Sequence, residues 1–183
     1  MMSAMSVPYD SKVEYLESPN DGVGTSVYID TGIIGDETCA FEIKFTYYKA
    51  QAVFGSRSTN SNAIIVASDR ARMGSTMAYL VLTNGTTYTV TLDKNAYVIN
   101  GTSYQLGASA FTTNNSVCIF SANSVSVSRM VGRIYYFKMW KNGELVRDFI
   151  PVRVGQVGYM YDKVSGVLFG NAGSGAFILG NDI

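Results

Sequence analysis

The sequence contains no histidine, two cysteines and few charges. Its 14 basic and 14 acidic residues balance, and charged residues make up 15% of the 183, against roughly 25% in typical proteins. Without histidine, a His-dependent triad, a His-ligated zinc site and the commonest general base are excluded. Because the net charge is zero, the usual electrostatic basis for binding nucleic acid or an anionic membrane is missing, and we expect neither partner.

Long apolar runs are also missing. The longest, such as 63–67 and 78–82, fall far short of the ~18 residues that span a bilayer, so no membrane insertion is expected. Residues 1–11 carry neither the basic nor the apolar part of a secretory signal. We therefore expect a flexible N-terminal arm over 1–11 and one domain over 12–183.

The two cysteines, Cys39 and Cys118, lie far apart and form no CxxC pair. Cys39 precedes Phe41, Ile43 and Phe45 at alternate positions, which predicts a buried strand face and a reduced thiol. A single Cys39–Cys118 bridge is the alternative.

Strand signals dominate what is present. Hydrophobic residues make up 47% and aromatic residues 13% of the chain, enough for a substantial core. The β-rich stretches are 12–17, 27–31, 41–48, 52–56, 63–67, 78–83, 86–92, 96–99, 102–106, 116–121, 133–140, 145–151, 157–161 and 167–169. Asn-Gly pairs at 84–85, 100–101 and 142–143 predict type I′ hairpin turns between such runs. Since no window has capped helical periodicity, the pattern predicts an all-β antiparallel sandwich or barrel.

For the hairpin around Asn142-Gly143, the loop length predicts which residues of the two strands face each other. A two-residue loop places Lys138 opposite Arg147 and Trp140 opposite Leu145. The predicted core side is Tyr135, Phe137, Met139, Val146 and Ile150, and Asp148 falls on it as the one exception. The other side is Tyr136, Lys138, Trp140, Leu145, Arg147 and Phe149. That register sets two cations opposite each other, which is unfavourable unless a carboxylate or a ligand lies between them.

Sugar recognition uses flat aromatic faces and fixed polar groups. On this basis Tyr136, Lys138, Trp140 and Arg147 are the candidate carbohydrate-binding residues, with Tyr48 or Tyr88 added from neighbouring strands. The alternative is that these aromatic residues pack under loops or against a neighbouring subunit.

No catalytic or cofactor motif is found. The five glutamates, Glu14, Glu17, Glu37, Glu42 and Glu144, are scattered, whereas glycoside hydrolysis needs paired carboxylates. No phosphate-cradling glycine loop is present, and no DxDxDG spacing points to calcium. We expect no enzyme activity, no cofactor and no metal; the alternative is calcium held by Asp21, Asp30, Asp36 or Asp162.

From about residue 13 to 180, the chain resembles the concanavalin A-like lectin/glucanase superfamily, in particular laminin-G-like domains of gut-bacterial surface proteins and of phage tail and fibre proteins. The likeness lies in segments 15–18, 28–32, 54–57, 97–101, 132–138 and 171–175. It is strongest in GELVRDFIP at 143–151 and YMYDKVSG at 159–166. The resemblance implies a jelly-roll sandwich of two curved antiparallel sheets.

The same resemblance implies a non-catalytic binding or assembly module. We expect a phage virion protein, as part of a fibre, tail or head decoration, that attaches to a glycan or receptor on a bacterial surface. Its partners would be other virion proteins and further copies of itself, in a trimer as in many fibre proteins. The alternative is a lectin-like carbohydrate-binding domain of a bacterial surface or secreted protein, located outside the cell. A glycan-cleaving enzyme ranks third, because the superfamily's hydrolases use clustered carboxylates that this sequence lacks.

Overall fold

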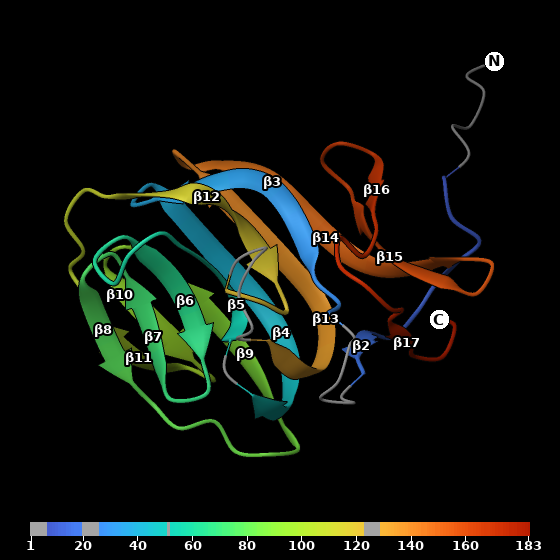
Figure 1. Cartoon of the computed structure of the whole chain (residues 1–183), viewed down its shortest axis with the longest axis horizontal. Coiled ribbons are helices and arrows are strands. Elements are labelled where there is room, and N and C mark those ends of the chain that lie inside the picture. Colours follow the sequence, from blue (N-terminus) through green and yellow to red (C-terminus); the bar gives the residue numbers. More distant parts are fainter. Residues whose placement is uncertain (1–6, 20–25, 51, 123–128) are drawn as a thin grey trace.

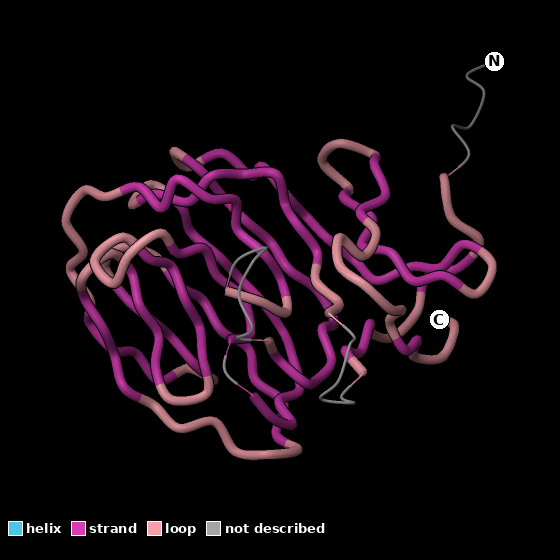
Figure 2. Tube along the Cα trace, viewed as in Figure 1, coloured by secondary structure: helices cyan, strands magenta, loops and turns pink. Residues whose placement is uncertain are grey.

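The computed structural model describes residues 7–19, 26–50, 52–122 and 129–183. Strands account for the regular structure of this part of the chain (Figure 2), and it contains no helix of the length and apolarity needed to cross a membrane. The strands are β1 (Ser11–Lys12), β2 (Leu16–Ser18), β3 (Ile29–Asp36), β4 (Cys39–Ala50), β5 (Ala52–Arg57), β6 (Ala63–Ala67), β7 (Arg70–Met73), β8 (Thr76–Tyr79), β9 (Thr86–Leu92), β10 (Ala96–Ile99), β11 (Thr102–Gln105), β12 (Thr112–Ile119), β13 (Met130–Lys141), β14 (Glu144–Val154), β15 (Val157–Asp162), β16 (Val167–Phe169) and β17 (Ile178–Leu179).

The strands form two antiparallel sheets that face each other (Figure 1). The larger sheet has the order β11-β10-β9-β4-β13-β14-β15-β16. In addition, β1 pairs with β14, β2 pairs with β13, and β17 pairs with β2. The smaller sheet has the order β3-β12-β5-β6-β7-β8. This architecture confirms the prediction of an all-β sandwich of the jelly-roll type.

Phenylalanine side chains from both sheets meet in the core. Phe41 and Phe137 of the larger sheet lie 5.0 Å and 5.3 Å, centroid to centroid, from Phe54 of the smaller sheet. Phe149 continues this row at 6.3 Å from Phe137. All four rings are nearly or fully buried, so the two sheets are held together chiefly by apolar contacts.

Two of the three predicted Asn-Gly hairpin turns are confirmed. Asn100 and Gly101 have φ values of 46° and 85°, and Asn142 and Gly143 have values of 52° and 80°, as a type I′ turn requires. The turn at Gly85 is different, because it precedes β9 in the connection from β8, a strand of the other sheet. A hairpin at that position was a wrong prediction.

The predicted register of the β13–β14 hairpin is wrong beyond its first two pairs. Trp140 does face Leu145, but the next pair is Met139 with Arg147, so Val146 is an extra residue in a β-bulge. From there each partner on β14 is shifted by one position. Lys138 therefore faces Asp148 rather than Arg147, which removes the expected opposition of two cations.

The shift also changes which side chains face the core, because adjacent residues of a strand point to opposite sides. Phe149, expected outside, is fully buried opposite Phe137. Tyr135 and Ile150, expected in the core, both line a surface hollow. For Tyr135 the cause is a second bulge, in which Ile134 and Tyr136 pair with consecutive residues of β4 and Tyr135 is left between them.

Both cysteines are buried, and neither forms a disulfide, as the strand pattern around Cys39 predicted. Burial raises the pKa of the Cys39 thiol to about 11 and that of Cys118 to about 12. Both side chains are thus neutral thiols packed as small apolar groups.

Part of the predicted N-terminal arm is paired with the domain. Ser11 and Lys12 form β1 beside Arg153 and Val152 of β14, and the Tyr9 ring lies 5.0 Å from that of Tyr161. Residues 1–6 of the arm lie outside the described residues.

Candidate functional site

The outward side of β4 and β13 carries most of the candidate binding residues. Phe41, Ile43 and Phe45 of β4 point into the core, so the alternate residues Glu42 and Lys44 point outward. We call the outward surface formed by Tyr15, Glu42, Lys44, Tyr48, Arg133, Tyr135, Tyr136, Lys138 and Trp140 the aromatic face.

Around Tyr136 and Lys138, the pairing of β13 with β4 determines which side chains of the aromatic face are neighbours. Tyr136 lies opposite Lys44, and Lys138 lies opposite Glu42. The Lys138 ammonium is 3.7 Å from the Glu42 carboxylate and 5.7 Å from the centre of the Tyr136 ring. These contacts restrain the lysine on the sheet surface while its side chain stays partly exposed.

Tyr136 remains a neutral phenol across the physiological range. Burial, and then the hydrogen bond to the Glu42 carboxylate, raise the pKa of Tyr136 to about 12. A neutral hydroxyl can both donate and accept a hydrogen bond, which suits recognition of a sugar hydroxyl.

Trp140 is the only tryptophan of the chain. It is partly buried and lies between Leu145 on β14 and Ala40 on β4. Because Ala40 has only a methyl group, this neighbour leaves space beside the indole.

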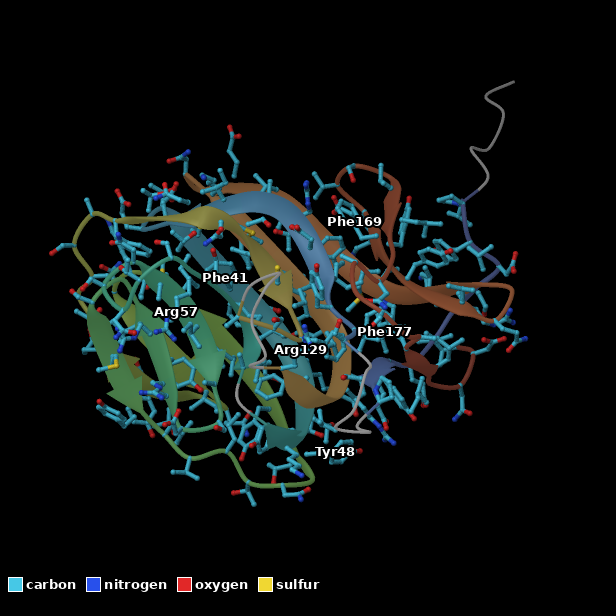
Figure 3. All side chains as sticks on the ribbon, in the orientation of Figure 1. Phe41, Tyr48, Arg57, Arg129, Phe169 and Phe177 are labelled. Atoms are coloured by element: carbon cyan, nitrogen blue, oxygen red, sulfur yellow. The ribbon has the colours of Figure 1, made fainter. Side chains whose placement is uncertain are left out.

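Nearer the start of β13, the Arg133 side chain contacts two aromatic rings and a carboxylate. Its guanidinium carbon lies 4.1 Å from the centre of the Tyr15 ring and 5.5 Å from that of Tyr48. Its Nε donates a hydrogen bond of 2.6 Å to Glu17, and this bond raises the pKa of the arginine further. The positive charge is thereby fixed in position and in protonation state (Tyr48 is labelled in Figure 3).

Bulges place two of the tyrosines on the aromatic face. Tyr48 and Tyr135 are each the extra residue of a bulge between β4 and β13. The Tyr135 hydroxyl lies 2.9 Å from the Thr46 hydroxyl, and its ring is 5.9 Å from that of Tyr15. The four tyrosines, Trp140 and the three cations thus form one surface that extends over both strands.

Arg147, the fourth candidate, is not brought together with the other three. Its Nε and Nη2 donate to the Thr31 carbonyl oxygen at 3.0 and 2.8 Å, and Nη1 lies 3.6 Å from Asp162. The guanidinium carbon is also 5.1 Å from the centre of the Phe169 ring (labelled in Figure 3). Because Thr31 belongs to β3, Arg147 links the larger sheet to the smaller one from the inner side of β14.

Of the two tyrosines named as additions, only Tyr48 lies on the aromatic face. Tyr88 faces Phe45 on the inner side of the larger sheet, with the ring centroids 5.6 Å apart. Its hydroxyl accepts a hydrogen bond from the Thr83 backbone N–H. Tyr88 therefore packs against the core and stabilises the connection between β8 and β9.

Sequence reasoning missed several members of the aromatic face. Glu42 and Lys44 were visible in the alternation of 41–47 but were not assigned to the site. Tyr15 and Arg133 approach each other only because β2 pairs with β13, with Glu17 opposite Arg133. No local signal in the sequence reports that pairing.

The carboxylates considered for calcium have other roles where they are described. Asp30 accepts a hydrogen bond from the Gly32 N–H, Asp36 is 2.8 Å from Lys141, and Asp162 is fully buried beside Arg147. Asp21 lies outside the described residues. Among the residues that the structure describes, no three or more His, Cys, Asp or Glu side chains gather as a metal site would require.

A scan against protein-family models gives no match for this sequence, and no curated protein matches it. We therefore infer the function from the geometry of the aromatic face and from the segments that resemble the concanavalin A-like superfamily.

Proposed function

We propose that the protein is a non-catalytic binding module that recognises glycans through the aromatic face. The observation that carries this proposal is the arrangement of Tyr136, Lys138 and Trp140 on one outward strand face. Aromatic rings offer a flat surface to the C–H side of a sugar, while Lys138, Glu42 and the Tyr136 hydroxyl offer polar groups in fixed positions.

A non-catalytic role is favoured by the ion pairs of Glu42 on this face and of Glu17 beside it. Glu17 binds Arg133 at 2.6 Å, and Glu42 lies 3.7 Å from Lys138. Each carboxylate is thus paired with a cation. A glycosidase instead needs an acid and a nucleophile or base aimed at the same glycosidic bond.

We place this binding module in the concanavalin A-like superfamily and in a phage virion, as a fibre, tail or head-decoration protein. The glycan would then belong to a bacterial surface, and the other partners would be virion proteins and further copies of the chain. Support comes from the segments at 143–151 and 159–166 and from the sandwich fold. The alternative is a lectin-like domain of a bacterial surface or secreted protein.

Replacing Trp140 by alanine tests the proposed face. We expect the wild-type protein to bind members of an array of bacterial surface polysaccharides and neutral glycans. Trp140→Ala should weaken that binding about tenfold or more, because burying an aromatic ring against the sugar contributes about 1.5–3 kcal/mol. Calorimetry on the glycan with the strongest array signal gives the two dissociation constants.

Tyr79→Ala is the matched control, because it removes a largely exposed ring from β8, in the other sheet. This control should bind as the wild type does, and both variants should remain folded, with a cooperative thermal transition above the temperature of the binding assay. Equal binding by folded Trp140→Ala and wild type would overturn the assignment of the face. Accumulation of reducing ends during incubation with the bound glycan would overturn the non-catalytic assignment.

A further inference from the structure

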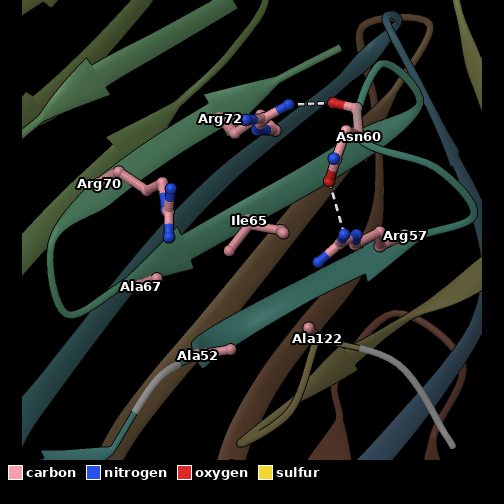
Figure 4. A pocket seen from close by; sticks show the side chains of 8 residues that line it. All are labelled: Ala52, Arg57, Asn60, Ile65, Ala67, Arg70, Arg72 and Ala122. Carbon is pink, nitrogen blue, oxygen red and sulfur yellow. Dashed lines mark hydrogen bonds between the residues drawn. The ribbon is translucent and has the colours of Figure 1, made fainter. Parts of the chain in front are cut away.

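A depression of about 260 Å³ lies on the outward side of the smaller sheet (Figure 4). It crosses β5, β6 and β7, on the side of the sandwich opposite the aromatic face. Its floor is formed by Ile65 and by the alanines at 52, 67 and 122. Three arginines, Arg57, Arg70 and Arg72, surround this floor.

Strand alternation explains why two of the arginines point the same way. In β7, Ala71 and Met73 are fully buried, so Arg70 and Arg72 project outward. Arg72 lies opposite Ile65 of β6, which places a guanidinium above the apolar floor. Arg57 is the exposed last residue of β5 and approaches from the other side.

Asn60 holds two of the guanidinium groups in place. Its side-chain Oδ1 accepts a hydrogen bond of 2.5 Å from Arg57, and its backbone carbonyl accepts one from Arg72. Figure 4 shows both bonds on one side of the depression. Both acceptor groups of Asn60 are neutral, so Asn60 orients the two guanidinium groups without adding a negative charge beside them.

The depression is positively charged in a chain that is neutral overall. Three of the seven arginines of the sequence lie there, and none of the described residues lining it is acidic. Asp69 lies beside it, 3.1 Å from Arg70. Burial, and then repulsion by Arg70 and Arg57, lower the pKa of Arg72, as expected where like charges are close together.

We propose that this depression binds an acidic sugar unit of a polysaccharide, with its carboxylate or sulfate held by Arg57 and Arg72 and its C–H face on Ile65 and the alanines. Guanidinium groups match the oxygens of such anions and form charge-assisted hydrogen bonds with them. The site is separate from the aromatic face and does not depend on it.

The size and shape of the depression favour a sugar over a longer polyanion. Its volume lies just below the roughly 300–1,000 Å³ of sites for drug-sized ligands, so the bound group is small. An apolar floor between cations suits a sugar ring with one charged substituent. A nucleic acid would instead need an extended basic surface, which a chain without net charge does not suggest.

Binding to trigalacturonate, dextran sulfate and uncharged dextran tests the site. We expect the wild-type protein to bind the two acidic probes at low salt and to bind dextran much less. Arg57→Gln and Arg72→Gln should each weaken binding of the acidic probes roughly tenfold, because each removes a charge-assisted contact. Arg57→Lys, which keeps the charge, should recover part of the loss.

Two further variants separate a specific site from general charge. Lys94→Gln removes one exposed positive charge at the β9–β10 turn and should bind as the wild type does. Asn60→Ala should weaken binding of dextran sulfate and leave the salt dependence of that binding unchanged. The arginine variants should also reduce the salt dependence, because a complex with one charged contact fewer releases fewer counterions when it forms. Asn60 is thus a positioning residue.

Several results would overturn the inference. One is equal affinity of wild type, Arg57→Gln and Arg72→Gln for the acidic probes, with thermal midpoints unchanged. Absence of binding to both acidic probes at low salt is another, and tighter binding of a short DNA duplex through the same arginines would replace the sugar by a nucleic acid. Trp140→Ala should leave binding of the acidic probes intact, so failure of the aromatic face and failure of this site are distinguishable.

Discussion

Replacing Asp162 by alanine is expected to lower the free energy of unfolding by about 3 kcal/mol, because a fully buried carboxylate would be removed from its partners. Its oxygens accept hydrogen bonds from the backbone N–H groups of Asp148, Val164 and Ser165, at 2.9, 3.1 and 3.3 Å. The Ser165 hydroxyl adds a fourth at 2.7 Å. Urea unfolding followed by far-UV circular dichroism measures the loss.

Asp162 also lies beside the arginine that joins the two sheets. Arg147 is 3.6 Å from the carboxylate, and its side chain is only 17% exposed, so the loss of Asp162 leaves a largely buried cation with carbonyl partners alone. This position explains the expected size of the effect. It also assigns Arg147 a role in stability, in contrast to the binding role expected from the sequence.

Asp93→Ala is the matched control for Asp162→Ala. Asp93 accepts backbone hydrogen bonds from Asn95 and Ala96 in the β9–β10 turn, at 2.7 and 2.8 Å, and forms no ion pair with any residue that the structure describes. Removing it should cost about 1 kcal/mol. Equal losses for the two variants would contradict the importance given to the Arg147 pair.

Replacing Phe137 by alanine is expected to lower the free energy of unfolding by about 4 kcal/mol, through a cavity in the core. The Phe137 ring is fully buried and contacts the rings of Phe41, Phe54 and Phe149, with centroid distances of 6.0, 5.3 and 6.3 Å. The substitution thus removes contacts between the sheets as well as within one sheet. Urea unfolding at fixed pH gives the difference.

Phe137→Leu is the conservative control for Phe137→Ala. It keeps most of the side-chain volume and should lose only about 1–2 kcal/mol. If Phe137→Ala lost no more than Phe137→Leu, the apolar row between the sheets would not be the main source of their association. A changed denaturant slope would instead indicate an altered unfolded or native state.

The longer strands of the larger sheet were predictable from local patterns, whereas β17 was not predicted and β1 and β2 were expected as one stretch over 12–17. The alternation at 41–47 identified the core side of β4, and the Asn-Gly pairs at 100–101 and 142–143 located two hairpins. Both signals act within a few residues, where the period of two and the positive φ of glycine and asparagine determine the conformation.

The bulges were not predictable from these patterns. A single extra residue, such as Val146, reverses the side of every residue that follows in the pairing, and nothing in its chemistry marks it as the extra one. This is why Arg147 was assigned to the sugar-binding side and Phe149 was excluded from the core. For the same reason, Tyr135 was expected in the core although it belongs to the aromatic face.

The arginine depression depends on tertiary structure. Strand β7 was not among the predicted strands, although Arg70, Ala71, Arg72 and Met73 alternate between polar and apolar side chains. A run of only four residues is too short for a reliable periodicity. The approach of Arg57 and Asn60 to β7 is fixed by the pairing of β5, β6 and β7, which the sequence does not display.

Tryptophan fluorescence tests the central claim most directly, because Trp140 is the only tryptophan and lies in the aromatic face. The wild-type protein would be titrated with the glycan that gives the strongest array signal, with calorimetry on the same samples. We predict a saturable change of the emission, with a midpoint equal to the calorimetric dissociation constant. Saturable binding by calorimetry with unchanged emission would place the glycan elsewhere and contradict the account.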